Sequence, residues 1–243
     1  MKILVTGAPG FLGSPLVQGL CQRHEPQQLR VLAVAPAPEF SSLGVEVVVG
    51  SILNPADVAR VLEGVTHVYH LAGFVSRKPA DGHRMFQIHV QGTRLLCEAA
   101  LQAGVKRILM VSTSGTVAVS KRADEMPDED SPTPLELVSR WPYYSSKLYQ
   151  EQTARRICAD RIELVMVNPS LLLGPGAVRP VRGDVANPSG LILMRDLQIA
   201  GAYLNGKLDT FSAAAKGEVQ VWGQIGKIEA VGLVLDRVPK YLS

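Results

Sequence analysis

The sequence MKILVTGAPGFLG, residues 1–13, decides the fold. Its apolar run at residues 3–5 predicts a strand, and Gly7, Gly10 and Gly13 follow at the opening of a helix that we expect from Phe11 to about His24. In such a turn one glycine allows the sharp change of direction, a second lets backbone approach a pyrophosphate, and the third permits close packing of helix on strand. The helix N-terminus adds free N–H groups and the positive end of the helix dipole. The opening therefore predicts a site for the diphosphate of a dinucleotide.

Short apolar runs alternate with longer amphipathic ones as far as residue 167. We expect strands at residues 3–5, 31–34, 45–49, 65–71, 106–111 and 164–167, and helices at 11–24, 55–63, 84–103 and 143–158. Asn54 and Pro55 predict an N-cap followed by proline at the first helical position. Buried strands alternating with helices predict a doubly wound α/β fold, with a parallel sheet covered by helices on both faces.

Two segments in the second half of the chain depart from this alternation. Residues 122–136 are acidic and proline-rich, which predicts a surface loop. Beyond Gly176 the pattern predicts one more helix at 188–201 and strands at 218–222 and 227–235. We therefore expect a dinucleotide-binding domain over residues 1–176 and a short substrate-side region over residues 177–243.

The composition and charge of the chain limit which partners and which cellular compartment we expect. The chain has 243 residues, 47% of them hydrophobic, with 25 basic and 22 acidic residues and a net charge of +3. Because no basic block is present, nucleic acid is not expected as the main partner. No apolar run predicts a membrane span, and the N-terminal run is too short for a signal peptide. Three widely spaced cysteines predict reduced thiols in a cytoplasmic protein. Histidine and cysteine spacings predict no metal site.

The ends of the second and third strands bear on cofactor preference. An acidic residue after the second strand favours NAD, and a nearby arginine favours NADP. This chain has Ala35, Pro36 and Ala37 there, so both cofactors stay open. After the third strand, Ser51 either hydrogen-bonds an adenine edge or acts only as a turn residue.

Tyr143 and Lys147 form a candidate acid–base pair. Four residues apart, they lie on one face of the predicted helix, whereas Tyr144 is rotated by about 100°. An ammonium near the phenol is expected to lower the tyrosine pKa. The fifth strand ends in hydroxyl-bearing side chains, including Thr113 and Ser114, at the edge of the sheet where ligands bind. The tyrosine–lysine spacing also arises on ordinary helix surfaces, so it is the combination of features that indicates a site.

Several motifs occur in order along the chain: Gly7-x-x-Gly10-x-x-Gly13, HLAG at 70–73, STSGTV at 112–117, YYSSK at 143–147 and NPSLLLGPG at 168–176. This set resembles the extended short-chain dehydrogenase/reductase superfamily, in its NAD-dependent epimerase/dehydratase group. The wording of the last three motifs is most similar to dihydroflavonol-reductase-like members. The resemblance implies a Rossmann-type sheet and bound NAD or NADP.

The resemblance also implies roles for individual residues. Tyr143 would be the catalytic acid/base, Lys147 would tune its pKa and bind the nicotinamide ribose, and Ser114 would orient the substrate oxygen, with Thr113 as second choice. The residues implied along the cofactor are Gly7, Gly10, Phe11, Leu12, Gly13, Ser51, Ile52, Leu71, Ala72, Gly73, Lys147, Pro169, Ser170 and Leu171.

Other implications concern assembly and departures from the family pattern. Members commonly form homodimers through two long helices, here near 84–104 and 143–158. His89 stands where many relatives carry asparagine; it either holds a water near Lys147 or is a satisfied, half-buried side chain. The region after Gly176 is shorter than the usual substrate lobe.

Three functions remain open at this level. The first is an NAD(P)-dependent oxidoreductase acting on a small-molecule carbonyl or secondary alcohol. The second is a nucleotide-sugar epimerase with tightly bound NAD. The third is a dinucleotide-binding protein with little catalysis, favoured by the short tail. A 4,6-dehydratase is disfavoured because Gly115 and Thr116 stand where it would need an acidic pair.

Overall fold

A computed structural model describes residues 1–76, 78–117, 119–120, 122, 127–169, 190–204, 213 and 216–223. The chain divides into two compact units, Met1–Ser170 and Leu171–Ser243. The boundary that the sequence predicts at residue 176 lies outside the described residues. Among the described residues, no helix is long and apolar enough to cross a membrane.

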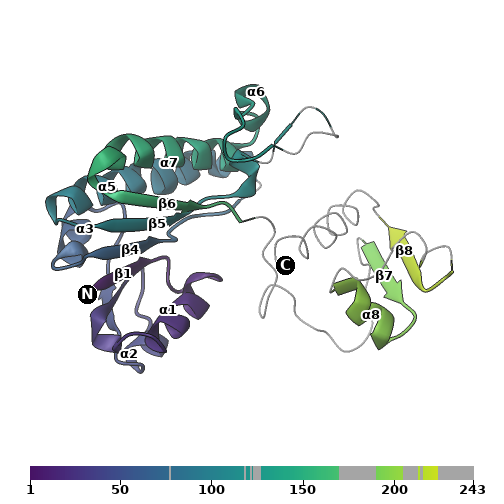
Figure 1. Cartoon of the computed structure of the whole chain (residues 1–243), viewed down its shortest axis with the longest axis horizontal. Helices are drawn as coiled ribbons and strands as arrows, with labels where there is room; N and C mark the ends of the chain where they lie inside the picture. Colours follow the sequence, from purple (N-terminus) through teal and green to yellow (C-terminus); the bar gives the residue numbers. More distant parts are fainter. Residues whose placement is uncertain are drawn as a thin grey trace. The chain divides into compact units, whose positions relative to one another are not determined.

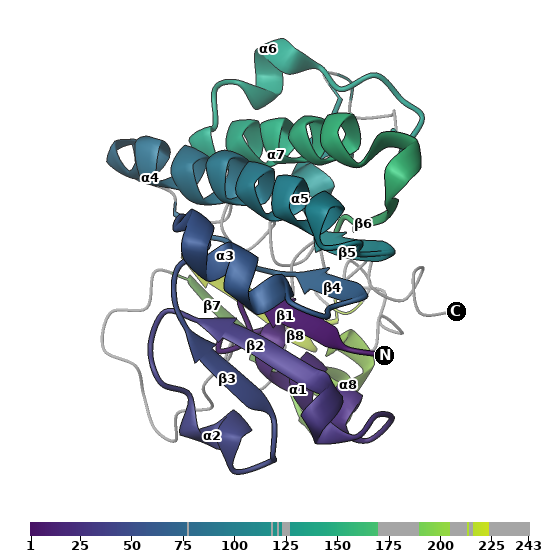
Figure 2. The same cartoon turned by 90° about the vertical axis from the view of Figure 1, so that its left-hand side faces the viewer.

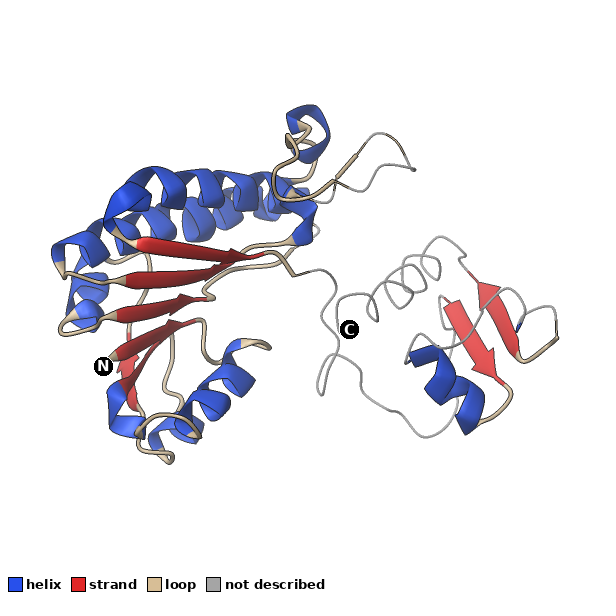
Figure 3. Cartoon of the chain, viewed as in Figure 1, coloured by secondary structure: helices blue, strands red, loops and turns tan. Residues whose placement is uncertain are grey.

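The first unit is built on a six-stranded sheet (Figures 1 and 3). Its strands are β1 (Ile3–Thr6), β2 (Leu29–Ala33), β3 (Glu46–Val49), β4 (His67–His70), β5 (Arg107–Val111) and β6 (Glu163–Val167). The spatial order is β3-β2-β1-β4-β5-β6, and every neighbouring pair is parallel. Figure 2 shows this order, with β1 near the middle. The chain winds outward from β1 in both directions, so the predicted doubly wound fold is confirmed.

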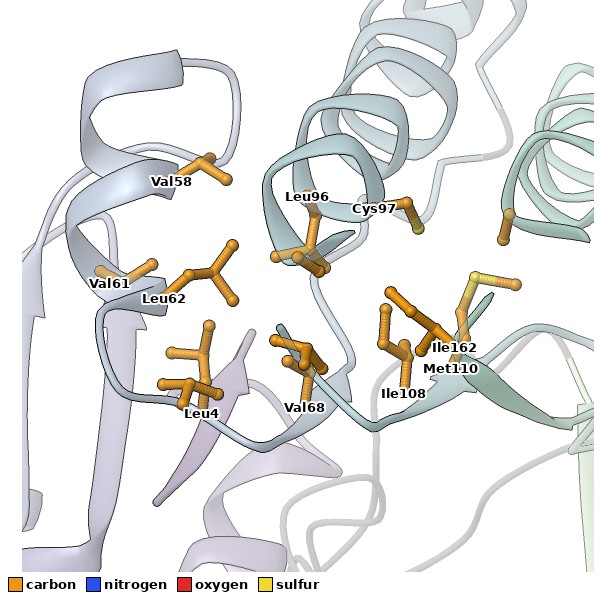
Figure 4. Close-up of a cluster of buried hydrophobic side chains, with 14 of the residues drawn as sticks. Leu4, Val58, Val61, Leu62, Val68, Leu96, Cys97, Ile108, Met110 and Ile162 are labelled. Carbon is orange, nitrogen blue, oxygen red and sulfur yellow. The ribbon is translucent and has the colours of Figure 1, made fainter. Parts of the chain in front are cut away.

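Helices cover the sheet in two layers. Their bounds are α1 (Gly13–Cys21), α2 (Pro38–Ser41), α3 (Pro55–Leu62), α4 (Gly82–Phe86), α5 (Thr93–Gln102), α6 (Leu135–Val138) and α7 (Pro142–Cys158). One buried cluster joins α3, α5 and α7 to the sheet, and Figure 4 shows its members converging, among them Leu62, Leu96 and Met110. A second cluster joins α1 and α2 to the other face through Val17 and Phe40. Burial of these side chains is the main stabilising term of the unit.

Local signals explain where several helices begin. The Asn54 side chain accepts a hydrogen bond from the N–H of Ala56 at 3.0 Å, which confirms the predicted cap of α3. The helix expected from Phe11 begins at Gly13 instead, because residues 7–12 form the turn; the N–H of Gly10 donates to the Gly7 carbonyl at 3.0 Å. The helix expected over 84–103 begins at Gly82 and contains a π-helical turn, Gln87–Gly92, between α4 and α5.

One buried arginine ties β2 to the end of α3. Arg30 is 7% exposed, and its Nη1 donates to the carbonyls of Val61 at 2.8 Å and Glu63 at 3.0 Å. Its Nε lies 2.9 Å from a carboxylate oxygen of Glu46 on β3. The guanidinium thus satisfies carbonyls that a helix end leaves without intrahelical partners.

The second unit contains β7 (Gly190–Met194), α8 (Leu197–Leu204) and β8 (Val219–Gly223). The strands β7 and β8 pair antiparallel. The prediction of a helix over 188–201 is therefore wrong in its first part: Ile192 is paired with Val221 in a ladder, and the helix begins only at Leu197. The strand expected at 218–222 is confirmed, and the one expected at 227–235 lies outside the described residues. In the first unit, α6 begins at Leu135 and so takes the last two residues of the loop expected over 122–136.

Candidate cofactor groove and acid–base site

A groove of about 670 Å³ lies where the ends of β1–β4 meet. Turns after all four strands contribute to its lining. Of the residues that the sequence assigns to the cofactor, the structure brings together Gly7, Gly10, Ser51, Ile52, Leu71, Ala72 and Gly73. These residues come from three separate strand ends, so the sheet topology assembles the groove.

The glycine turn fits tightly against the end of β4. Gly7 has φ +75°, and a Cβ on it would lie 2.7 Å from the backbone nitrogen of Ala72. A Cβ on Gly13 would lie 2.3 Å from the Gly7 carbonyl oxygen. The N-cap residue of α1, Leu12, makes no side-chain cap. The N–H of Ser14 donates to the Gly10 carbonyl at 3.0 Å and Pro15 has no N–H, so this helix end offers an anion the N–H of Gly13 and the positive end of the helix dipole. The turn therefore fits the diphosphate of a dinucleotide.

Five other predicted cofactor residues do not line the groove: Phe11, Leu12, Gly13, Lys147 and Pro169. Phe11 is 43% exposed, and Leu12 and Gly13 open α1. Pro169 follows β6, and its carbonyl accepts a hydrogen bond from the Ser114 N–H at 2.9 Å. Ser170 and Leu171 lie outside the described residues.

Ser51 has contacts that suit both of its expected roles. Its hydroxyl oxygen accepts a hydrogen bond from the N–H of Leu53 at 3.1 Å, as in a turn. Its own N–H donates to the Asp57 carboxylate at 2.9 Å. The hydroxyl still lines the groove, where its proton can be donated to a ligand.

Tyr143 faces the end of β5 from the first turn of α7. Its side chain is hydrogen-bonded to that of Thr113, and its ring packs edge-on to His89 with centroids 5.8 Å apart. Burial and the neighbouring Tyr144 raise the pKa of Tyr143, and the Thr113 hydrogen bond acts in the opposite direction. The structure thus pairs the phenol with Thr113, the second choice of the sequence for the substrate-orienting hydroxyl.

Lys147 lies one turn further along α7 and is 6% exposed. Its ammonium donates to the carbonyl of Val111 and to Oε1 of Gln150, both at 2.8 Å. Burial lowers its pKa from 10.5 to about 8, although Glu151 opposes the shift. The expectation that this ammonium lowers the tyrosine pKa is wrong in this structure, because the ammonium binds Val111 and Gln150 and the pKa of Tyr143 is raised.

A buried polar network connects Lys147 to the groove. The Gln150 amide donates to Thr93 at 2.8 Å, and Thr93 bonds His70 at 2.8 Å. The other ring nitrogen of His70 bonds the Thr6 hydroxyl at 2.8 Å. Burial lowers the pKa of His70 to about 3, with a smaller effect from the Lys147 charge. The network is therefore uncharged apart from Lys147, which it holds in place.

His89 is a fully buried connector between the groove and α7. Its Nε2 accepts a hydrogen bond from the N–H of Phe74 at 3.0 Å, so Nδ1 carries the ring hydrogen and donates to Ser146 Oγ at 2.8 Å. The Ser146 hydroxyl in turn donates to the carbonyl of Tyr143 at 2.8 Å. Burial lowers the pKa of His89 to about 3. Of the two roles expected for His89, these contacts support the satisfied side chain.

Glu151 is a buried carboxylate that sequence reasoning missed. Its Oε1 accepts hydrogen bonds from Ser112 Oγ, from Thr116 Oγ1 at 2.6 Å and from Asn168 Nδ2 at 2.9 Å. These contacts fix both ends of the turn that carries Thr113 and Ser114. Its spacing of four from Lys147 and eight from Tyr143 places all three on one helix face, a signal that was available.

The groove also contains residues that the sequence did not suggest. Phe74, Arg84, Gln87 and Ile88 line it from the loop after β4 and the following helix. Residues 84, 87 and 88 have the spacing of one helix face, which could have been recognised as a second, groove-facing side. Among the described residues, no cluster of three or more His, Cys, Asp or Glu side chains forms a candidate metal site.

Residues 3–194 match the family model described as NAD-dependent epimerase/dehydratase. The chain belongs to the NAD-dependent epimerase/dehydratase family. Its sequence is 31% identical over 180 residues to sterol demethylase protein B of Methylococcus capsulatus, covering 74% of this chain and 54% of that protein. It is also 31% identical over 193 residues to dihydroflavonol 4-reductase of Zea mays, covering 71% and 53%. This member of the family thus spans about half the length of these two relatives.

Solved structures agree with this family assignment. A short-chain dehydrogenase/reductase superfamily protein of Agrobacterium tumefaciens with bound NAD is 34% identical, with a TM-score of 0.59, covering 69% of this chain and 48% of that one. The UDP-glucose 4-epimerase of Thermus thermophilus in complex with NAD is 26% identical, also with a TM-score of 0.59, covering 69% and 54%. The predicted resemblance, the Rossmann-type fold and the nicotinamide cofactor class of the epimerase/dehydratase family are confirmed.

Proposed function

We propose that this chain supplies the cofactor-binding and acid–base part of an NAD(P)-dependent oxidoreductase acting on a carbonyl or secondary alcohol. The observation that carries the proposal is the placement of Tyr143, Thr113 and Lys147 at the end of β5, in the unit that also forms the glycine-turn groove. Such a groove beside an acid–base pair at the carboxyl edge of a parallel sheet is where this architecture binds and transforms ligands.

The cofactor, when bound, would accept or supply the hydride. The residues of this chain handle the proton. In the direction of reduction, the Tyr143 hydroxyl donates its proton to the oxygen of the substrate as that oxygen gains charge. The hydroxyl of Thr113, or that of Ser114, donates a hydrogen bond to the same oxygen. Lys147, with a pKa of about 8, carries positive charge at neutral pH, and its ammonium, held by Val111 and Gln150, is assigned to the nicotinamide ribose.

The remaining residues of the site would bind the cofactor or hold other side chains in position. Gly7, Gly10 and Gly13 present backbone to the diphosphate, and Ser51 and Ile52 form the adenosine end. Leu71, Ala72 and Gly73 lie along the cofactor, and Pro169, Ser170 and Leu171 are assigned to its nicotinamide end. Glu151 acts through other residues, because it holds the turn of Thr113 and Ser114.

Tyr143→Phe tests the proposal. The parent protein and the variant are assayed with NADH and NADPH against a panel of ketones, aldehydes and UDP-sugars, and cofactor binding is measured separately. We expect turnover to fall by at least a hundredfold in the variant while cofactor affinity is kept, since general acid catalysis contributes about 10² to 10⁴ in rate. Thr113→Val and Ser114→Ala identify the orienting hydroxyl: the larger loss of turnover marks it. Equal turnover by the parent and Tyr143→Phe would refute the tyrosine role.

A nucleotide-sugar epimerase is the second candidate, favoured by the likeness to the Thermus thermophilus epimerase. It would retain one NAD through purification and would interconvert UDP-sugars without added cofactor. A cofactor-binding protein that turns over none of these substrates would instead be a binding module, the third candidate.

We further propose a homodimer formed through helices α4, α5 and α7 in the cytoplasm. Phe86 of α4 and Tyr149 of α7 pack together with ring centroids 5.6 Å apart, and Tyr149 is 49% exposed. The cysteines are free thiols, as expected in a reducing compartment. Sedimentation equilibrium of the parent and Tyr149→Glu tests the dimer, because a charge at the interface should shift the variant toward the monomer.

A further inference from the structure

We propose that Arg84 neutralises the diphosphate of the bound dinucleotide. The proposal rests on the proposed cofactor binding and adds to it a residue that neither the motifs nor the glycine turn indicates. The groove lining explains why such a residue is needed. Among the described residues that line it, Arg84 is the one ionisable side chain; the others are glycine, proline, aliphatic, aromatic or uncharged polar residues. A diphosphate brings two negative charges into this groove, and the α1 N-terminus offers only partial charges.

Arg84 is held at the groove by stacking on Phe74. Its guanidinium carbon lies 4.4 Å from the centroid of the Phe74 ring. The backbone that carries this ring is anchored, because the N–H of Phe74 donates to the buried His89 at 3.0 Å. A guanidinium over an aromatic ring is held by its charge, and its N–H groups that point away from the ring can meet a phosphate in fork geometry. In the part of the chain that the structure describes, no carboxylate competes for them.

The position of Phe74 indicates that Arg84 would contact the diphosphate of the dinucleotide and not a 2′-phosphate on its ribose. Phe74 follows Gly73 at the end of β4, and this end touches the glycine turn: a Cβ on Gly7 would lie 2.7 Å from the Ala72 nitrogen. The end of β2, where a ribose 2′-phosphate would be recognised, lies on the opposite side of β1 in the sheet order. Arg84 therefore lies on the diphosphate side of the groove and makes no distinction between NAD and NADP.

The test compares dissociation constants of Arg84→Met with those of the parent. Titration calorimetry is carried out with NAD, NADP, ADP-ribose and adenosine. We expect Arg84→Met to weaken NAD, NADP and ADP-ribose by a similar factor of about 10 to 100, as for loss of a charged hydrogen bond, and to leave adenosine unchanged. Arg84→Lys should recover part of the loss, and the affinity of Arg84→Met for NAD should depend less steeply on salt than that of the parent.

Arg94→Met is the matched control. Arg94 is an exposed arginine on the following helix, bonded to Glu98 and outside the groove lining, so the control should bind every ligand as the parent does. Phe74→Leu keeps an apolar wall but removes the stacking surface, and we expect a smaller loss in the same direction.

Three outcomes would overturn the inference. Unchanged affinities in Arg84→Met would show that its charge does not serve the cofactor. A loss confined to NADP would assign the charge to the 2′-phosphate and refute the diphosphate assignment. A parent that binds none of the dinucleotides would refute the proposed cofactor, and the inference with it; that result is distinguishable because the parent itself fails.

Discussion

Two glycines in the same helix should respond in opposite ways to the addition of one methyl group. In Gly13→Ala the new Cβ would lie 2.3 Å from the Gly7 carbonyl oxygen and 2.5 Å from the Cα of Ala8. Both are backbone atoms that no rotamer change can move. Relief of the first contact alone requires a shift of about 1 Å, and overpacking of this kind costs about 3 kcal/mol of unfolding free energy. A shift of that size would also open the turn that fits the diphosphate.

Gly19→Ala is the control within α1. A Cβ there meets nothing within 4 Å, so the substitution only exchanges a poor helix former for a good one and should stabilise the protein by about 0.5–1 kcal/mol. Urea unfolding monitored by circular dichroism gives both free energies, and NADH fluorescence gives the affinity. We expect the two variants to differ by about 4 kcal/mol, with cofactor binding lost only in Gly13→Ala. Equal stability of Gly13→Ala and the parent would refute the steric reasoning.

Three further expectations concern stability. Arg30→Met should lower the unfolding free energy by about 3 kcal/mol, because the buried Val61 carbonyl loses its charged partner; urea midpoints measure the loss, and a change under 0.5 kcal/mol would contradict it. Leu96→Ala should lower it by about 2–5 kcal/mol through the cavity left in a fully buried site, and a loss under 1 kcal/mol in the same assay would argue against close packing there. His70 and His89 have folded-state pKa values of about 3 against 6.5 when unfolded, so the unfolded chain binds more protons as pH falls below 6.5. The unfolding free energy should therefore drop by about 2 kcal/mol per histidine at pH 5. His89→Asn should make it depend less steeply on pH, and an unchanged slope would show that His89 does not contribute to the pH dependence.

The parts of the fold that could be predicted are those in which local sequence and tertiary structure agree. The glycine turn, the β-branched strand at 46–49 and the Asn54 cap each specify their own conformation through neighbours in the chain. The strand at 190–194 could not be recognised, because its apolar residues suit a helix equally well and only the distant partner Val221 decides between them.

Helical spacing predicted which residues share a helix face, but it did not predict their contacts. A spacing of four correctly placed Tyr143 and Lys147 on one helix face. The spacing does not specify which groups the ammonium of a long lysine side chain reaches. In the structure the ammonium binds Gln150 and Val111, and Val111 is 36 positions away in sequence. The roles of His89 and Glu151 likewise depend on partners from other elements, which no local pattern specifies.

The π-helical turn at Gln87–Gly92 limits how the length of this segment can vary. A residue added to or removed from an α-helix rotates everything before it by about 100° relative to everything after it. Because the wider turn stands between α4 and α5, deleting one position there would swing Arg84 away from the groove and carry the buried Met85 toward water. The number of residues in this segment is therefore fixed by the angular phase between the two helices that it joins.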